Sequence, residues 1–306
     1  MKKIISLLTA GMLIFPLISC GKKSTDLGKI KIAYLPITHS LALLETADEL
    51  EKQTGLKVEL VKYGSWPELL DALNTGRVDG ASVLIELAMK SKEQGIGIKA
   101  VALGHKDGNV IIASNDILSA EELAGKTFAI PHRQSSHNIL LNDALASVGL
   151  TINDVNITEL SPTEMPSALA SGQIDGYCVA EPFGAKAISL DVGKALFTSE
   201  ELWEDSLCCG LVLTENFINN HSEDAKFFVE SYKQAGKNLT KEKAIETAKK
   251  YLNQDDDVLE LSLQWISYDD LEITEENYNA LTEKVKAYGL SENPPSYTEF
   301  VKNDFE

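Results

Sequence analysis

Three short polar loops contain the residues of this sequence that are most able to bind a small molecule. Their letters are PITHS at 36–40, YGSWP at 63–67 and HRQSSHN at 132–138. Each loop leads into a stretch with helical periodicity. The first turn of a helix offers unpaired backbone N–H groups and a positive potential, which suit an anion or a polar oxygen. Each loop could simply cap its helix, but three loops in matching places favour a binding site.

Patterns typical of catalysis or of metal binding are absent. The sequence has no GxSxG, no HExxH and no phosphate-binding P-loop. Its cysteines form no CxxC pair and have no Cys/His spacing of a zinc site. We interpret Cys178, Cys208 and Cys209 as small buried hydrophobes and not as a disulfide pair. His39 and His137 are expected to line a site or cap a helix, so the sequence predicts no enzyme, no metal and no cofactor.

The composition is that of a globular protein with a strong negative charge. Hydrophobic residues make up 44% and charged residues 24% of the 306 residues, and the formal net charge is −18. Nucleic acid is not an expected partner, because phosphate binding needs clustered Lys and Arg. Arg77 and Arg133 are the only arginines. A bound anion would depend on Arg133, on lysines or on backbone N–H groups.

Residues 1–19 have the pattern of a bacterial signal peptide. Two lysines precede an apolar stretch over 4–18 that is too short to span a bilayer comfortably. The sequence Leu-Ile-Ser-Cys that ends at Cys20 resembles a lipobox, although a plain signal peptide with an incidental Cys20 is the alternative. We expect a lipoprotein with palmitate-type acyl chains on Cys20 and a tether over 20–28. It would lie outside the cytoplasm, anchored to a bacterial cell membrane.

Strand and helix patterns alternate along the chain and indicate an α/β fold with a largely parallel sheet. The first series has strands at 29–35, 56–61, 78–84 and 98–103 and helices at 40–53 and 67–74. The series restarts at Ser119, with strands at 127–131, 156–160 and 174–179 and helices at 135–148 and 165–170. The chain after Ser222 is helical and charged.

One helix–turn–strand unit occurs twice. Residues 68–83 can be laid on residues 164–179 with seven of sixteen positions identical, 96 residues apart. In each copy a glycine suits the left-handed end of the helix, and an aspartate can bond nearby backbone N–H groups at the turn. The spacing is too long for a solenoid repeat and fits two similar lobes, with chance similarity as the alternative.

These segments resemble the substrate-binding proteins of nitrate/sulfonate/taurine/bicarbonate ABC importers over about residues 29–220. The segments that carry the resemblance are 34–38, 65–67 with 69–80, 123–126, 135–138 and 180–184. The resemblance implies a two-lobed, type II-like periplasmic-binding-protein fold with a ligand cleft. Lobe 1 would span 29–114 and 206–306, and lobe 2 would span 115–205. The chain would cross near 113–116 and return near 206–213, and the C-terminal helices would pack on lobe 1.

The resemblance also implies a function and a set of cleft residues. The chain would deliver a small polar or anionic ligand of the nitrate, bicarbonate, sulfonate or taurine type to a permease and an ATPase. The segment 205–210 lacks the basic residue of the nitrate branch, which counts against a simple inorganic anion. A thiamine-precursor pyrimidine stacked on Trp66 and Phe183, or an enzyme on the same fold, are alternatives. The implied cleft residues are Thr38, His39, Trp66, Ser82, Ser135, Ser136, His137 and Glu181.

Overall fold

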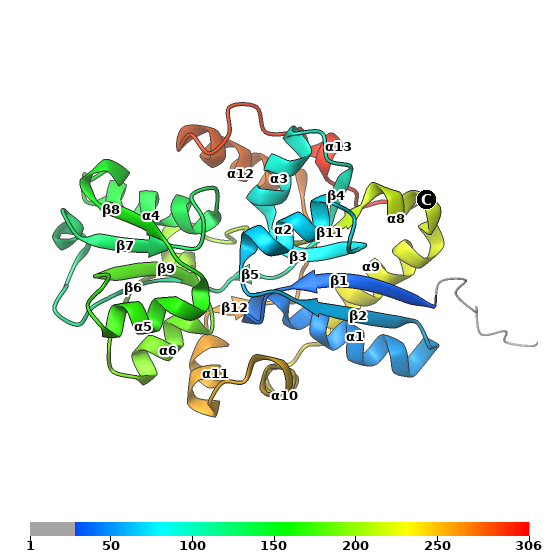
Figure 1. The fold of residues 1–306 in the computed structure, drawn as a ribbon, viewed down its shortest axis with the longest axis horizontal. Helices are drawn as coiled ribbons and strands as arrows, with labels where there is room; N and C mark the ends of the chain where they lie inside the picture. The colour runs from blue at the N-terminus through cyan, green and yellow to red at the C-terminus, as the bar shows by residue number, and fades with distance from the viewer. Residues whose placement is uncertain (1–27, 306) are drawn as a thin grey trace, which may run out of the picture.

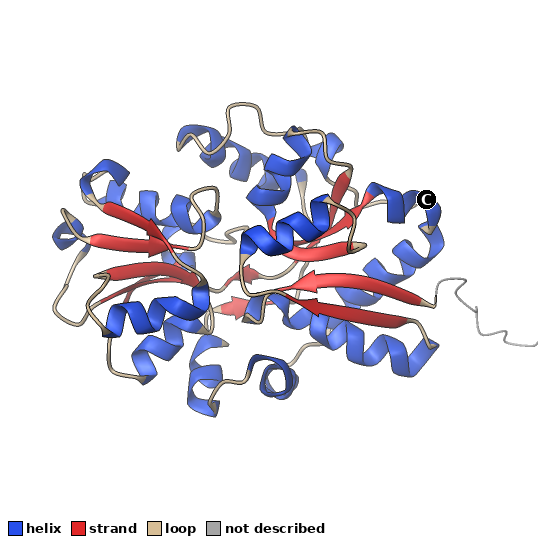
Figure 2. Cartoon of the chain, in the orientation of Figure 1, coloured by secondary structure: helices blue, strands red, loops and turns tan. Residues whose placement is uncertain are grey.

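Two five-stranded sheets stand side by side along the long axis of the molecule, with helices packed around both (Figure 1, Figure 2). The structure is a computed structural model, and it describes residues 28–305. The predicted signal peptide and Cys20 lie outside these residues. The first sheet has the order β2 (Lys57–Lys62), β1 (Lys29–Tyr34), β3 (Gly80–Leu84), β11 (Cys209–Thr214) and β4 (Ile98–Leu103). The second has the order β10 (Lys194–Thr198), β6 (Asn109–Ala113), β9 (Gly176–Ala180), β7 (Thr127–Ile130) and β8 (Asn156–Glu159).

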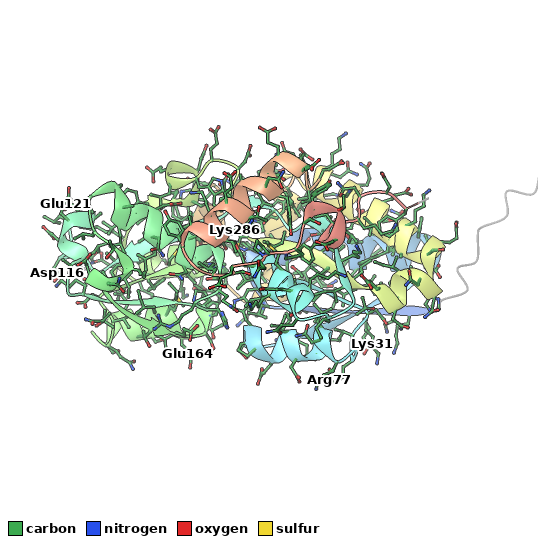
Figure 3. The ribbon with its side chains drawn as sticks, turned by 90° about the horizontal axis from the view of Figure 1, so that it is seen from above. Lys31, Arg77, Asp116, Glu121, Glu164 and Lys286 are labelled. Atoms are coloured by element: carbon green, nitrogen blue, oxygen red, sulfur yellow. The ribbon has the colours of Figure 1, made fainter. Side chains whose placement is uncertain are left out.

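The central strands of both sheets are covered on both faces. Every residue of β3, β6, β9 and β11 is buried, whereas the edge strands β2 and β8 are partly exposed. Strands with two covered faces need apolar or small residues throughout, which explains their continuous apolar runs. Charged side chains such as Arg77 and Glu164 point outward from the surface (Figure 3).

The repeated unit occupies the same place in both lobes, as the sequence predicts. The first copy forms α2 (Trp66–Asn74) and β3, and the second forms α5 (Met165–Ala170) and β9. The turn glycines Gly76 and Gly172 have φ of 68° and 70°, the left-handed conformation that favours glycine. The aspartates make a longer-range contact than expected. Asp79 accepts from the amide of Lys31 at 2.8 Å, and Asp175 accepts from the amide of Thr127 at 2.7 Å.

The first sheet takes one strand, β11, from the chain after its return, whereas all five strands of the second sheet lie between the two crossings. β1, β2 and β3 are parallel, as predicted, but β11 runs antiparallel to β3 and β4. In the second sheet β6 runs antiparallel to β9 and β10. Since β6 belongs to the second sheet, the first crossing lies at β5 (Lys106–Asp107), ahead of the segment 113–116 named from the sequence. β5 pairs with β12 (Ile266–Ser267).

Helices surround each of the two sheets. In and around the first sheet they are α1 (Leu41–Thr54), α2, α3 (Ile85–Glu93), α8 (Glu215–Asn220), α9 (Ser222–Lys237), α10 (Lys241–Leu252), α12 (Glu275–Ala287) and α13 (Tyr297–Phe300). Around the second sheet and below it they are α4 (Ser136–Ser147), α5, α6 (Phe183–Ser189), α7 (Ser199–Leu202) and α11 (Asp256–Ser262). The 3-10 helices are η1 (Thr38–Ser40), η2 (Ala120–Leu123), η3 (Ile152–Asp154) and η4 (Pro162–Glu164). No helix of the described range is long and apolar enough to cross a membrane.

The C-terminal helices contact both lobes and not the first alone. On the first lobe, Lys250 of α10 pairs with Asp48 of α1 at 2.6 Å. On the second lobe, Lys284 of α12 pairs with Asp143 of α4 at 2.8 Å. Ser189 of α6 likewise donates to Asp257 of α11. Of the C-terminal helices, α11 and α12 therefore reach the second lobe, whereas α8 and α9 lie at the far end of the first lobe (Figure 1).

Candidate functional site

Buried polar groups without hydrogen-bond partners mark the junction of the lobes. In the first lobe they belong to Trp66, which begins α2, and to Glu86, near the start of α3. In the second they belong to Ser136 and His137, which begin α4. Leaving such a group buried and unpaired costs roughly 1–3 kcal/mol. The full set at this junction is Trp66 Nε1, both carboxyl oxygens of Glu86, both ring nitrogens of His105, Asn109 Nδ2, Ser136 Oγ and both ring nitrogens of His137.

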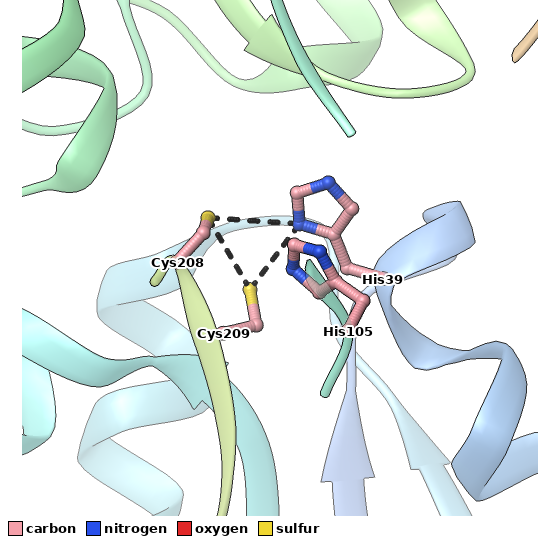
Figure 4. Close-up of side chains that lie close together, drawn as sticks. All are labelled: His39, His105, Cys208 and Cys209. Carbon is pink, nitrogen blue, oxygen red and sulfur yellow. Dashed lines mark hydrogen bonds between the residues drawn. The ribbon is translucent and has the colours of Figure 1, made fainter. Parts of the chain in front are cut away.

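Two histidines and two cysteines gather beside this set, and we call them the His–Cys cluster: His39, His105, Cys208 and Cys209 (Figure 4). One ligand atom from each lies within 4.8 Å of the others, and all four residues are fully buried. His39 Nδ1 is 3.6 Å from Cys208 Sγ and 3.5 Å from Cys209 Sγ, and the two sulfurs are 3.8 Å apart. The rings of His39 and His105 have centroids 3.6 Å apart.

Three separate segments build the His–Cys cluster. His39 lies in η1, which follows β1 after a three-residue loop. His105 follows β4 and stands just before the first crossing, whereas Cys208 and Cys209 stand where the chain returns into β11. Gly104 lets these segments approach, because a Cβ there would lie 3.0 Å from the His39 carbonyl oxygen and 3.1 Å from that of Cys209. The cluster thus lies where both crossings meet the first lobe.

Burial and mutual interaction shift the pKa values of these groups. Burial lowers the pKa of His105 to about 4, and His39 adds to the shift. Burial also lowers the pKa of His137 to about 4 and raises that of Glu86 well above its usual range. Burial alone would raise the pKa of Cys208, but its hydrogen bond with Cys209 and the nearby histidines outweigh burial and hold that pKa well below its usual range. The titrating groups of this buried centre are therefore coupled to one another.

Three of the eight implied cleft residues have side-chain groups left free for a ligand. These are Trp66, Ser136 and His137. Ser135 is used internally, since its hydroxyl caps Asn138 and donates to the carbonyl of His132. Ser82 accepts from Ser40. The remaining three have polar partners within the protein: Thr38, His39 and Glu181.

Thr38 and Glu181 join the two lobes. The amide and the hydroxyl of Thr38 both donate to the backbone carbonyl of Glu181, each at 2.9 Å. The carboxylate of Glu181 accepts from the amide of Ala185 in the first turn of α6. Burial raises the pKa of this carboxyl to about 8. In this structure both residues act as parts of the lobe contact.

Sequence reasoning missed five polar residues of this junction: Glu86, His105, Asn109, Cys208 and Cys209. His105 and Cys208 flank apolar strands, so their nearest sequence neighbours give no ligand pattern. The expectation that no Cys/His spacing points to a metal site considered local spacing alone, whereas the cluster joins residues up to 170 positions apart. Arg133, the arginine favoured for an anion, is exposed and donates to the carbonyl of Ile157. Within residues 28–305 the buried polar side chains include no lysine or arginine.

Comparison with known proteins places the chain in a family. A crystal structure of the ligand-binding component of an ABC-type import system from Staphylococcus aureus, with zinc bound, is 43% identical and superposes with a TM-score of 0.86. The match covers 90% of this chain and 96% of that one. The nitrate-binding protein NrtA of Synechocystis has the same fold, with a TM-score of 0.78 at 15% identity over 87% of this chain and 83% of that one.

Curated relatives agree with the predicted resemblance. The nitrate import ATP-binding protein NrtC of Synechocystis is 27% identical over 63% of this chain, which spans 32% of that protein's length. A putative aliphatic sulfonates-binding protein of Escherichia coli is 27% identical over 61% of this chain and 60% of its own length. The resemblance to substrate-binding proteins of nitrate and sulfonate importers is confirmed, as is the periplasmic-binding-protein fold. The model of the NMT1-like family matches residues 24–253, which is three quarters of this chain. The chain therefore belongs to that family.

Proposed function

We propose that this chain is the solute-binding component of an ABC-type importer and works outside the cytoplasm. The observation that carries the proposal is the set of unpartnered polar groups buried between the lobes, contributed by Trp66 on one side and by Ser136 and His137 on the other. A bound solute would supply the missing partners and hold the lobes together, as expected for closure about a cleft. The names of the relatives, which refer to import of nitrate, bicarbonate and sulfonates, support this role.

The unpartnered groups favour a small solute rich in hydrogen-bond acceptors. The indole nitrogen of Trp66 and the amide nitrogen of Asn109 can only donate. Ser136 Oγ can donate as well, and it stands in the first turn of α4. Oxyanions of the nitrate, bicarbonate, sulfonate or taurine type have the acceptors that such donors need. They would be held by neutral donors, because no buried lysine or arginine is present in the described residues.

The test begins with the solute that the protein itself selects. Full-length chain from its native host is denatured, and the released small molecule is identified by mass spectrometry. Its affinity is then measured by calorimetry for Trp66→Phe and for the control Trp265→Phe, in which the ring is partly buried elsewhere. Loss of one hydrogen bond of about 1–1.5 kcal/mol predicts an affinity about tenfold weaker for Trp66→Phe alone. Recovery of no solute, with no response to nitrate, bicarbonate or aliphatic sulfonates, would overturn the proposal.

A neutral heteroaromatic solute such as a thiamine-precursor pyrimidine is a second candidate. It is favoured by the absence of buried cations in the described residues and by the buried ring of Trp66. Stacking depends on the ring and not on its N–H group. Trp66→Phe would then keep most of the affinity, whereas Trp66→Leu would lose it. An enzyme on this fold would return a changed solute after incubation, and we propose that the solute is recovered unchanged.

The location and partners complete the proposal. The basic start, apolar stretch and lipobox-like end over residues 1–20 support a cleaved signal peptide and a lipid anchor on Cys20. Such an anchor would keep the chain at the membrane surface, beside the permease and ATPase that it serves. We propose that the anchor holds the chain on the extracytoplasmic side of a bacterial cell membrane, in the periplasm or on the outer surface.

A further inference from the structure

We propose that a thiophilic metal ion, of which zinc is the type, binds to the His–Cys cluster at the junction of the lobes: His39, His105, Cys208 and Cys209. This site goes beyond the proposed function, since it requires neither a solute nor a transporter. Its donors are two sulfurs and two imidazole nitrogens, the set that zinc prefers in proteins. Calcium and magnesium prefer oxygen ligands and are disfavoured by this set.

Three distances within the cluster match the edges of a zinc tetrahedron. With Zn–S of about 2.3 Å and Zn–N of about 2.0–2.1 Å, tetrahedral geometry gives edges of about 3.8 Å for S–S and about 3.6 Å for S–N. The sulfurs of Cys208 and Cys209 are 3.8 Å apart. Nδ1 of His39 lies 3.6 Å and 3.5 Å from them. One face of the tetrahedron is therefore already in place, with a ring nitrogen of His105 within 4.8 Å for the fourth position.

A hydrogen bond fixes His39 in the tautomer that a metal needs. Nε2 lies 2.9 Å from the backbone carbonyl of Gly108, which can only accept, so Nε2 carries the proton. Nδ1 therefore presents its lone pair to the two sulfurs (Figure 4). A histidine ligand whose other nitrogen donates to a backbone carbonyl is the usual arrangement around bound metals.

Hydrogen bonding alone leaves the cluster unsatisfied. The single lone pair of His39 Nδ1 can accept one thiol proton, although two sulfurs stand at nearly equal distance from it, and the Cys208 thiol has Asn109 Oδ1 at 3.7 Å as its other acceptor. Both ring nitrogens of His105 are buried without a partner. One ion would bind the lone pair, one nitrogen of His105 and both sulfurs at once. Two thiolates also neutralise a divalent ion, so the loaded site carries no net charge in its buried setting.

The position of the site gives the ion a mechanical role. Cys208 and Cys209 lie where the second crossing returns, and His105 lies where the first crossing leaves. The ion would clamp both crossings to η1 of the first lobe. Thr38, the neighbour of His39, contacts Glu181 of the second lobe, so the clamp would also order the residues that meet when the lobes close.

The test uses cobalt(II) as a spectroscopic probe of the full chain. We expect one equivalent to bind and to give the intense visible bands of a tetrahedral site together with thiolate-to-cobalt charge transfer, and zinc to displace it. Cys208→Ser and Cys209→Ser should each abolish or weaken the charge transfer and reduce zinc affinity by more than the roughly 10–100-fold that an outer-shell partner costs. Cys178→Ser is the matched control, because this buried free cysteine lies in the core of the second lobe.

Two results would overturn the site. One is a wild-type chain that binds no cobalt or zinc in stoichiometric amount, and the other is a spectrum unchanged in the Cys208→Ser, Cys209→Ser double variant. If circular dichroism shows that the variants do not fold, X-ray absorption of the zinc-loaded wild-type chain decides. A mixed shell of sulfur and nitrogen supports the site, and a shell of oxygen and nitrogen alone overturns it. Neither result depends on the solute test for importer function.

Discussion

Both donors of Thr38, the amide and the hydroxyl, converge on one acceptor, the backbone carbonyl of Glu181, at 2.9 Å each. Thr38 belongs to the first polar loop after β1, and Glu181 directly follows β9 of the second sheet. Two buried hydrogen bonds therefore span the lobes at one point. Any opening motion that separates Thr38 from Glu181 must break both of them, so they favour the arrangement in which these two residues are in contact.

Thr38→Val is expected to weaken closure. It keeps the amide bond and the branched shape but removes the hydroxyl bond, at a cost of about 1 kcal/mol. Solute affinity should fall about fivefold, and small-angle scattering of the solute-free chain should show a larger radius of gyration. Thr46→Val is the control, because its hydroxyl bonds to Ala42 within α1. An unchanged affinity and radius in Thr38→Val would show that this contact does not govern closure.

Glu181 is expected to make stability depend on pH. Burial raises the pKa of its carboxyl in the folded chain to about 8, against 4.5 as its ordinary value. Between pH 4.5 and 8 the folded chain therefore holds a proton that the unfolded chain has lost. The contribution of Glu181 to the free energy of unfolding is therefore largest below pH 4.5 and falls as pH rises toward 8. At about 1.4 kcal/mol per pKa unit, the loss amounts to a few kcal/mol.

Glu181→Gln should remove this pH dependence. The amide oxygen of Gln can still accept from the amide of Ala185, as the Glu181 carboxyl group does. We expect urea unfolding at several pH values to show a variant whose stability relative to wild type grows from pH 5 to pH 8. Glu68→Gln is the control, because Glu68 is exposed on α2, and its free energy of unfolding should change with pH as that of wild type does. If the free energies of unfolding of Glu181→Gln and wild type differ by the same amount at every pH, the buried carboxyl is not neutral in the folded chain.

The aspartates of the repeat are expected to stabilise the two lobes equally. Asp79 and Asp175 each tie the turn to the neighbouring parallel strand through an amide at 2.8 Å and 2.7 Å. Asp79→Ala and Asp175→Ala should each reduce the free energy of unfolding by about 1–3 kcal/mol, because each leaves an amide without its partner. Asp71→Ala, which removes an exposed ion pair with Arg77, should cost less than about 1 kcal/mol. An equal loss of unfolding free energy in all three variants would show that the two repeat aspartates stabilise their lobes no more than an exposed ion pair does.

The alternation of apolar strands and helices predicted most elements of the fold. It placed β1, β2, β3 and the equivalent β7, β8, β9, and the repeat related the two sets. It did not reveal that β11 and β6 enter the sheets antiparallel. Their apolar runs are compatible with either direction, and the order of elements along the chain does not report which sheet a strand joins after a crossing.

The sequence indicates candidate binding residues only where a polar loop leads into a helix. Trp66, Ser136 and His137 stand at helix starts, and that signal is local. His105 and Cys208 are single polar residues beside buried strands, and sequence alone interprets them as core. They become candidate metal ligands only because three segments of the chain meet in space, and spacing along the sequence does not show that meeting.

Cys20 is expected to carry the lipid. The residue lies outside the described range, and the prediction rests on the ordered basic, apolar and lipobox-like pattern before it. Cells that express Cys20→Ala should give chain without incorporated radiolabelled palmitate, either unprocessed or released from the membrane fraction. Cys178→Ala, which changes a buried cysteine, should be labelled as wild type. A wild-type chain that takes up no palmitate would favour the plain signal peptide, and a labelled, membrane-held Cys20→Ala chain would show that the lipid is on another residue.

Gly104→Ala is expected to disturb the proposed metal site without removing a ligand. The new methyl group would lie 3.0 Å from the carbonyl oxygen of His39 and 3.1 Å from that of Cys209, and backbone atoms cannot rotate away as a side chain can. The two ligand segments must therefore move apart by a few tenths of an ångström, which spoils the matched S–N edges. We expect zinc affinity to fall roughly 10–100-fold, as for loss of an outer-shell partner. Gly97→Ala is the control, since its nearest neighbours are side-chain atoms of Glu215. Because the four ligands remain, cobalt should still give thiolate charge transfer in Gly104→Ala, and a variant with wild-type zinc affinity would show that the spacing of these segments does not set the strength of the site.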